Sequence, residues 1–268
     1  MGKRIKDSNI MILADFDPNK KAVINPENLV NKQEGIPDTA VTCFSRDTFH
    51  RLVKELAAVK ITVRSLANLE IPIYIAEYKG YSFVLYLSSV GAPACGLLME
   101  DAYALGVNKI VMFGTCGVLD SSIDDCSIII PDKAVRDEGT SYHYAPLSNE
   151  VDVNKNYVNE FIELLNQYEC KYTVGKVWTT DAFYRETYDK VAKRKAQGCI
   201  CVDMECSAAA AIAQFREKEL FQFFYAADNL DNENWDMRSL SNTDKLDEKD
   251  KIAILAMEMA YKITAKDK

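Results

Sequence analysis

The sequence lacks any long apolar run. No stretch of its 268 residues approaches the roughly 20 consecutive apolar residues that a helix needs to cross a bilayer. The polar start at residues 1–7 also lacks the apolar core of a secretory signal. We therefore expect a cytoplasmic protein with no membrane partner.

Linker-like and repetitive segments are missing as well. The 7 prolines and 11 glycines are not gathered into a Pro/Gly/Ser-rich tract that would separate two domains. Apolar residues make up 48% of the chain, which is ample for one core. Residues 1–268 are predicted to form a single domain.

Positive charge is in deficit. The chain has 32 Lys and Arg residues against 40 Asp and Glu residues, which gives a formal net charge of −8. Such a mean surface repels nucleic-acid phosphates and anionic membranes. A small molecule is the expected partner.

Potential metal ligands are few. The only histidines, His50 and His143, lie far in sequence from the cysteines Cys199, Cys201 and Cys206. Without a histidine close in sequence, these cysteines lack a usual partner for a structural zinc site. We expect no metal, and we expect the eight cysteines to be reduced core residues.

Several catalytic signatures are absent. The chain contains no G-x-S-x-G nucleophile elbow, no G-x-x-x-x-G-K-[ST] phosphate loop, no G-x-G-x-x-G after a strand and no H-E-x-x-H. Cys116 and His143 remain as an alternative thiol nucleophile and base, although nothing in the sequence brings them together.

What the chain does have is an alternation of apolar runs with helical patterns, which is typical of an α/β fold with a mixed, largely parallel sheet. The strands are predicted at residues 9–15, 41–44, 71–78, 81–88, 109–113, 128–130, 172–179, 199–202 and 220–227. The helices are predicted at residues 45–56, 91–105, 154–168, 187–197, 207–217 and 245–266.

Two acidic residues, Glu205 and Asp228, follow apolar runs on either side of an Ala-rich helix. In a βαβ unit of parallel strands both carboxylates emerge at the carboxyl edge of the sheet, where open α/β folds bind ligands. Two predicted turns, Gly91-Ala-Pro-Ala and Gly114-Thr-Cys-Gly117, offer backbone N–H groups for an anion or a sugar hydroxyl. This edge is the expected active site.

Six motifs occur in order along the later part of the chain: Gly91-Ala-Pro-Ala, Gly114-Thr-Cys-Gly117, Val135-Arg-Asp-Glu-Gly-Thr-Ser-Tyr-His-Tyr, Thr179-Thr-Asp-Ala-Phe-Tyr184, Val202-Asp-Met-Glu205 and Ala227-Asp228. With these motifs the chain from Val84 onward resembles the uridine phosphorylase and purine nucleoside phosphorylase family. The resemblance implies a three-layer α/β/α fold with a mixed, distorted central sheet. It also implies a homo-oligomer, either a dimer or a trimer of dimers, that acts on a nucleoside and inorganic phosphate without a metal or organic cofactor.

The resemblance also implies roles for individual residues. Met204 would pack under the ribose, and Glu205 would accept hydrogen bonds from its hydroxyls. Asp228 matches the acid on the purine side, which would donate a proton to the leaving base. Phe183 matches an aromatic residue that stacks on the base or sugar, and Thr115 matches the hydroxyl near phosphate and ribose.

The chain departs from the family at the phosphate. Met112 stands where the phosphorylases carry an Arg, two residues before Gly114. The family's early Gly-Asp-Pro-x-Arg loop corresponds to residues 16–20 of this chain, where Lys20 stands in place of the Arg. Arg136, Arg46 and Arg185 are candidates to restore the charge, Arg46 from a neighbouring subunit, and Thr115 and the Gly114 amide would also face the phosphate.

The base-binding segment departs as well. The stretch from Phe183 to Tyr188 is shorter than the Gln-x-Arg loop by which uridine enzymes bind uracil, and Arg185 and Thr187 lie nearest those positions. Strict uracil specificity is therefore not expected.

Three hypotheses follow. The first is a nucleoside phosphorylase that releases a free base and ribose 1-phosphate. The second is a nucleosidase that uses water, suggested by Met112 and by the spare acids Asp15 and Asp17. The third is a nucleoside-binding protein that has lost the reaction.

Overall fold

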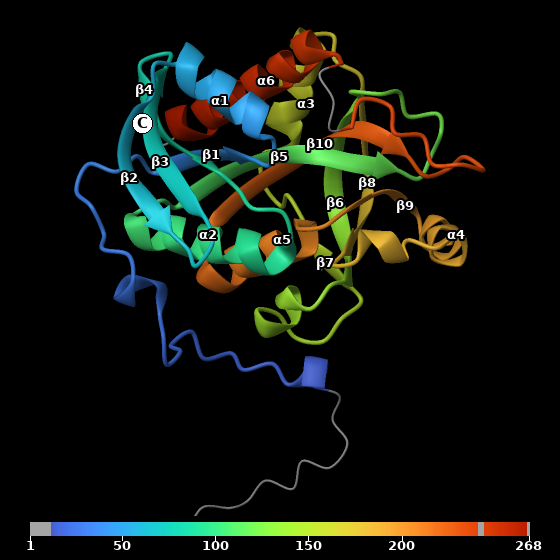
Figure 1. The fold of residues 1–268 in the computed structure, drawn as a ribbon, viewed down its shortest axis with the longest axis horizontal. Helices are drawn as coiled ribbons and strands as arrows, with labels where there is room; N and C mark the ends of the chain where they lie inside the picture. The colour runs from blue at the N-terminus through green and yellow to red at the C-terminus, as the bar shows by residue number, and fades with distance from the viewer. Residues whose placement is uncertain (1–11, 241–243, 267–268) are drawn as a thin grey trace, which may run out of the picture.

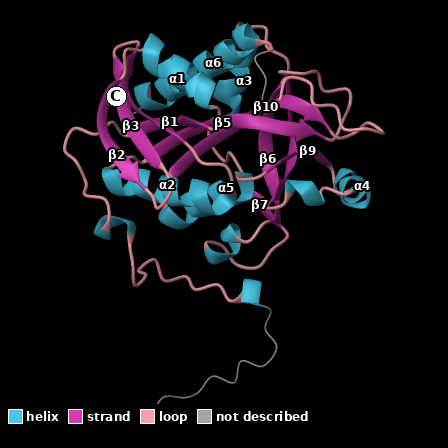
Figure 2. Ribbon diagram, viewed as in Figure 1, coloured by secondary structure: helices cyan, strands magenta, loops and turns pink. Residues whose placement is uncertain are grey.

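The computed structural model describes residues 12–240 and 244–266, in which ten strands form one mixed sheet between two layers of helices (Figure 1). Three helices cover one face: α1 (Arg46–Glu55), α3 (Val158–Gln167) and α6 (Leu246–Ala265). Two cover the other: α2 (Ala92–Leu105) and α5 (Cys206–Arg216) (Figure 2). The predicted three-layer α/β/α fold is confirmed.

The remaining elements complete the chain. The strands are β1 (Thr39–Cys43), β2 (Val59–Ser65), β3 (Glu70–Tyr78), β4 (Tyr81–Leu87), β5 (Lys109–Val118), β6 (Ile128–Asp137), β7 (Glu150–Asp152), β8 (Tyr172–Thr180), β9 (Cys199–Asp203) and β10 (Glu219–Asn229). The further helices are α4 (Tyr188–Ala196) and four short 3-10 helices: η1 (Ile12–Ala14), η2 (Pro26–Asn28), η3 (Thr140–His143) and η4 (Phe183–Arg185).

The sheet closes on itself at one end. β5 pairs with β10, β10 with β6, β6 with β8, β8 with β9, and β9 again with β5, so that five strands form a ring. Four other strands extend from β5 as an open sheet in the order β1, β4, β3 and β2, and β7 pairs with β6. The distortion that the resemblance implies is thus a closed barrel joined to an open sheet.

β5 shows how the sequence builds both sides of the core. Val111 and Phe113 pack toward α1, α3 and α6, while Ile110 and Met112 pack toward α2 and α5, as the two-residue period of a strand requires. The Phe113 ring stacks on Phe223 of β10 with 5.6 Å between centroids. Because both faces are covered, the strand is apolar along most of its length.

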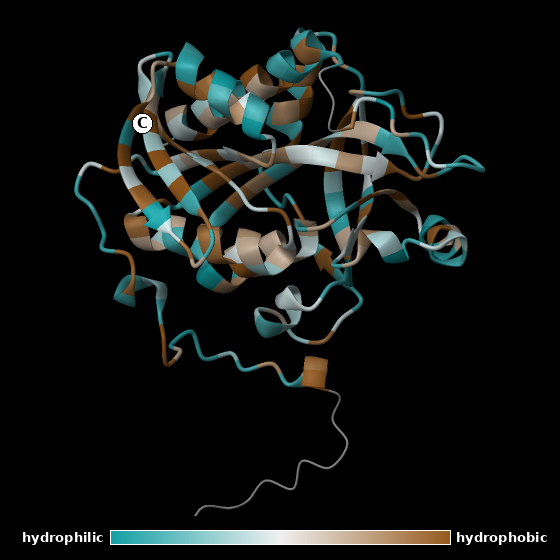
Figure 3. Ribbon diagram, in the orientation of Figure 1, coloured by the Kyte–Doolittle hydropathy of each residue, from teal (hydrophilic) through white to brown (hydrophobic). Residues whose placement is uncertain are grey.

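The helices differ in how much surface they bury. Figure 3 shows strongly hydrophilic positions on α1, whereas α5 is mostly pale to brown. Residues 206–213 of α5 are all buried, which suits the small side chains of its Ala-rich sequence because they let the helix lie close to the sheet and to α2. The start of α5 is thereby fixed beside the end of β9.

Four features differ from the sequence-based predictions. Part of the predicted strand 9–15 is the 3-10 helix η1, and residues 9–11 lie outside the described residues. Gly114 to Gly117 is not a turn but a continuation of β5, because β10 and β9 supply partners on both sides. β2 and β7 were not predicted. β9 and β10 are not a simple parallel βαβ pair, since β5 lies between them and runs antiparallel to β9.

The described part of the chain contains no helix long and apolar enough to cross a membrane.

Candidate active site

Glu205 links the β9–α5 connection to the segment that precedes α2. It occupies the N-cap position of α5, directly after β9, and only 6% of its surface is exposed. Its Oε1 accepts a hydrogen bond of 2.5 Å from the backbone N–H of Gly91, the residue that precedes α2. Gly91 has φ +98°, a conformation that a side chain would strain. Gly91 therefore suits this position, because it adopts the positive φ at which its N–H donates to Glu205.

Asp203 holds the backbone of Glu205 in place through hydrogen bonds. Its Oδ1 accepts a hydrogen bond of 2.7 Å from the Thr179 hydroxyl on β8. Its Oδ2 accepts from the backbone N–H groups of Glu205 and Cys206 at 2.8 and 2.7 Å. The side chain thus satisfies N–H groups at the start of α5 that the helix itself cannot pair. Sequence analysis assigned no role to Asp203, although an Asp just before an Ala-rich helix is a capping signal.

Asp228 lies on the other side of β5. It is 8% exposed, follows a register shift in β10 and pairs with Gly117. A Cβ on Gly117 would lie 3.1 Å from Asp228 Oδ1, so the glycine leaves room for the carboxyl group. The Asp228 Oδ2 accepts a hydrogen bond of 2.8 Å from Nε1 of Trp235.

The two acids come together at Gly117. This residue pairs with Asp228 on one side and with Val202 of β9 on the other. Adjacent strands lie about 4.8 Å apart, so the backbones of β9 and β10 are separated by about 10 Å at this level. The ends of β9 and β10 therefore place Glu205 and Asp228 on either side of the end of β5. The prediction had β9 and β10 as parallel strands of one βαβ unit, whereas here β9 is antiparallel to β5.

Burial raises the pKa of every acid at this position. It raises the pKa of Asp203 to about 6 and, with the Asp203 charge, that of Glu205 to about 8. Burial also raises the pKa of Asp228, against the hydrogen bond from Trp235. Because Asp203 accepts three hydrogen bonds and Glu205 receives fewer, Asp203 holds the charge and Glu205 the proton near neutral pH.

Sequence analysis did not identify Glu186. The residue directly follows η4, and burial with the charges of Asp228 and Asp203 raises its pKa to about 7. The available signal was an acid in the segment that resembles the base-binding loop.

The predicted substrate contacts differ in exposure. Met204 is half-buried between the two acids of its motif, and Thr115 is half-buried on β5. Phe183 is 50% exposed, and its ring lies tilted against that of Tyr184 with 3.9 Å between centroids. Arg185, also on η4, is exposed.

Gly114 is covered on one side by an aromatic ring. A Cβ on Gly114 would lie 2.8 Å from the Phe44 ring, so the close packing of Phe44 depends on the glycine. The structure thus gives Gly114 a packing role alongside the predicted contact of its amide.

Arg136 is buried and fully engaged by its own loop. Its Nε donates to the Ser141 hydroxyl at 2.8 Å, and Nη1 donates to the Pro146 carbonyl at 2.7 Å and to the Ser148 hydroxyl at 2.9 Å. Nη2 donates to the Ala145 carbonyl at 3.2 Å. These contacts leave the guanidinium bracing residues 141–148, and they give no support to its predicted contact with phosphate.

Lys20 lies at the far end of α5 from Glu205. Its ammonium group pairs with Glu217 at 2.7 Å, beyond the last turn of the helix. Eleven residues of α-helix span about 16 Å, so Lys20 does not reach the acids of its own subunit. The nearby acids Asp15 and Asp17 flank Phe16, which packs on Phe215 at 6.2 Å, so they also lie toward that end of α5.

The other two phosphate-side positions differ from each other. Met112 is fully buried in the core against α2 and α5. Arg46 is exposed at the start of α1, directly after β1, whose last residue pairs with Phe113 next to Gly114. Among the described residues Arg46 has no hydrogen bond or ion pair.

Comparison with known proteins identifies the family. A model of the phosphorylase superfamily matches residues 38–265, which is most of the chain. The chain belongs to the phosphorylase superfamily. The resemblance inferred from the motifs is therefore confirmed.

Individual members of the superfamily are only distantly similar. The chain is 24% identical to a guanosine phosphorylase of Halorubrum lacusprofundi over 55% of its own length and 61% of the other, and 24% identical to the uridine phosphorylase of Escherichia coli over 54% and 58%. It is 29% identical to a 5'-methylthioadenosine/S-adenosylhomocysteine nucleosidase of Buchnera aphidicola over 52% and 64%. The matches thus span less than two thirds of these curated relatives.

Solved structures agree on the fold. The uridine phosphorylase of Vibrio fischeri superposes with a TM-score of 0.72 at 21% identity, over 90% of this chain and 99% of the other.

The alternative Cys–His site does not form in this member of the superfamily. The Cys116 thiol is buried, and burial raises its pKa well above the usual value, which disfavours the nucleophilic thiolate. His143 is exposed on η3. Cys199 and Cys201 lie in different core clusters although they are two residues apart, and the pairing of β9 with β8 shifts register between them. The described residues contain no group of three His, Cys, Asp or Glu side chains placed to bind a metal.

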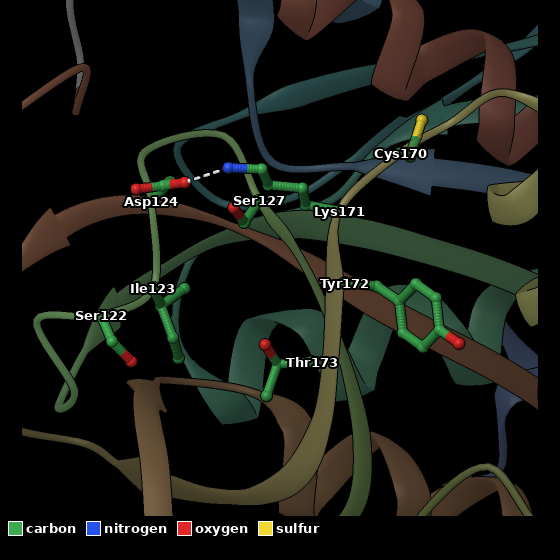
Figure 4. A pocket seen from close by; sticks show the side chains of 8 residues that line it. All are labelled: Ser122, Ile123, Asp124, Ser127, Cys170, Lys171, Tyr172 and Thr173. Carbon is green, nitrogen blue, oxygen red and sulfur yellow. Dashed lines mark hydrogen bonds and ion pairs between the residues drawn. The ribbon is translucent and has the colours of Figure 1, made fainter.

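A separate surface hollow of about 360 Å³ lies at the amino ends of β6 and β8 (Figure 4). Its lysine, Lys171, is paired with Asp124 at 2.7 Å. None of Asp203, Glu205, Asp228 and Glu186 lines this hollow, so it is not part of the candidate site.

Proposed function

We propose that the protein cleaves the N-glycosidic bond of a nucleoside with inorganic phosphate as the acceptor. The observation that carries the proposal is the placement of two buried acids, Glu205 and Asp228, around the end of β5 at Gly117. Membership of the phosphorylase superfamily supports it.

The chemistry requires two acids with different roles. As the C–N bond breaks, its electron pair moves to the base and positive charge develops on the sugar. Glu205 stabilises this charge as a carboxylate, because sugar hydroxyls that donate to it lower its raised pKa. Asp228, whose pKa burial raises, donates its proton to the base nitrogen. Met204 packs under the sugar and Phe183 packs on the base.

The acceptor forms the new bond to the anomeric carbon. A phosphate oxygen attacks this carbon and yields ribose 1-phosphate. The Gly114 amide, the Thr115 hydroxyl and Arg46 are the proposed phosphate contacts, with Arg46 supplied by a second copy of the chain in a homo-oligomer. The uncommitted, exposed guanidinium of Arg46 supports this role.

Hydrolysis of the same bond is a second candidate. It is favoured by the positions of the cations, since Arg136 braces its own loop, Lys20 pairs with Glu217, and Met112 replaces an Arg. A site rich in carboxyl groups attracts a phosphate dianion poorly, whereas water carries no charge.

One product analysis separates these functions. The protein is incubated with guanosine, inosine, adenosine and uridine, with and without phosphate, and the products are separated. Phosphorolysis predicts phosphate-dependent base release with ribose 1-phosphate, and an increased KM for phosphate in Arg46→Ala but not in Lys20→Ala. Base release with free ribose, independent of phosphate, would establish the nucleosidase instead. Ligand binding without any base release would leave only a binding protein.

A further inference from the structure

Glu186 carries a carboxyl group without a protein partner beside the site. The side chain is half-buried, and among the described residues it makes no hydrogen bond or ion pair. Its backbone N–H donates to the Phe183 carbonyl at 3.1 Å, which fixes the turn that carries both side chains. A carboxyl group taken from water without a donor is costly, and a ligand that supplies an N–H removes that cost.

The surroundings place Glu186 at the base end of the site. The charged groups near it are Asp228 on β10, Asp203 on β9 and Lys190 on α4. Two residues further on, the Tyr188 hydroxyl donates to the Glu233 carbonyl at 3.0 Å. This contact holds the start of α4 against the loop that carries Trp235, the partner of Asp228. Glu205, by contrast, is tied to Gly91 on the other side of the site.

From this juxtaposition we propose that Glu186 determines base specificity and selects nucleosides of 6-oxopurines. The proposal rests on the proposed function and names its substrate class. Asp228 donates to a ring nitrogen, whereas an ionised Glu186 only accepts. Guanine offers an N1–H and a 2-amino group on its six-membered ring, and hypoxanthine offers an N1–H. Adenine presents a bare N1 acceptor there, which leaves the carboxylate unpaired and repels it.

Substrate competition in Glu186→Gln tests the assignment. The kcat/KM values for guanosine, inosine and adenosine are measured for the wild-type protein and the variant. We expect the wild type to prefer guanosine over adenosine by at least about 10-fold, the usual effect of one unpaired buried polar group. A Gln side chain can donate to the adenine N1, so the preference should fall by about 10-fold in the variant, mainly through KM.

A matched control and a binding measurement complete the test. Asp189→Asn removes one negative charge three residues away on an exposed position and should leave the preference unchanged. Equal wild-type activity on guanosine and adenosine, or one common loss for every nucleoside in Glu186→Gln, would overturn the assignment. If no nucleoside is cleaved, the proposed function fails, and calorimetric titration with guanine and adenine decides the assignment separately. Tighter binding of guanine that Glu186→Gln abolishes supports it, and equal binding overturns it.

Discussion

Asp203 and Glu205 are close neighbours with opposite protonation. Three hydrogen bonds to Asp203 stabilise its charge, and burial together with that charge raises the pKa of Glu205. The motif therefore separates a structural acid, which caps α5, from an acid that is free to meet a ligand. The two carboxyl groups of the motif give no sign of this division in the sequence, because it depends on backbone N–H groups placed by the fold.

Replacing Glu205 tests the proposed electrostatic role. In Glu205→Gln the side chain keeps its size but has no negative charge to stabilise the developing positive sugar. We expect kcat/KM for nucleoside cleavage to fall by about 100-fold or more, which is typical for the loss of a preorganised electrostatic contact. The measurement is steady-state base release, with circular dichroism to verify the fold.

Glu217→Gln is the control for this substitution. Glu217 lies on the surface at the other end of α5, paired with Lys20, so its replacement should leave turnover unchanged. Wild-type turnover in Glu205→Gln would show that the carboxylate has no part in the reaction.

The segment after β6 works as a brace between elements. Arg136 binds Ser141, and the Ser141 backbone N–H donates to Glu138 Oε2 at 2.9 Å. Glu138 Oε1 accepts a hydrogen bond of 2.8 Å from the Ser207 hydroxyl in the first turn of α5. The Ser207 backbone N–H reaches Thr179, which binds Asp203. The Arg-Asp-Glu-Gly-Thr-Ser sequence thus supports the acids through a chain of hydrogen bonds.

Arg136→Met should therefore cost stability. The substitution keeps much of the apolar stem but removes the donor to the carbonyl groups of Ala145 and Pro146 and to the hydroxyl groups of Ser141 and Ser148. We expect the free energy of unfolding to fall by at least about 2 kcal/mol, because hydrogen bonds to charged groups are worth about 1.5–3 kcal/mol each. Urea denaturation measures the change, and Arg185→Met, on an exposed position, should change it by less than about 0.5 kcal/mol. An unchanged stability with an increased KM for phosphate would assign Arg136 to the anion instead.

Elements with a strong local signal could be predicted from the sequence. The hairpin of β3 and β4 and the helix α2 follow from Lys79-Gly80 and from Gly91 with Pro93, since these residues specify a turn and a helix start. The end of β5 could not be predicted, because Gly114 and Gly117 are favoured in turns and only the flanking β9 and β10 make them a strand. Arg136 and Lys20 show the same limit for the site, since their contacts come from loops whose course has no periodic pattern.

At the scale of the whole molecule, closure of the five-stranded ring concentrates carboxyl groups. β8, β9 and β10 follow one another in the sequence, and their ends bring together Asp203, Glu205 and Asp228, with Glu186 beside them. No cation of the described residues forms an ion pair with these four acids. Burying these carboxyl groups therefore lowers the free energy of unfolding, and the size of the decrease depends on pH.

The free energy of unfolding should decrease as the pH rises from about 5 to about 8. Burial raises the pKa of Asp203 to about 6, that of Glu186 to about 7 and that of Glu205 to about 8, whereas carboxyl groups in the unfolded chain titrate near 4. Between these values the folded state binds more protons than the unfolded state, so stability is present at low pH and is lost as each folded-state pKa is passed. Urea denaturation at unit pH intervals measures the slope. Glu205→Gln should flatten it between pH 6 and 8, because the neutral side chain no longer titrates, and Glu217→Gln should keep it. A wild-type slope of the opposite sign would mean that the acids around Gly117 are not buried together.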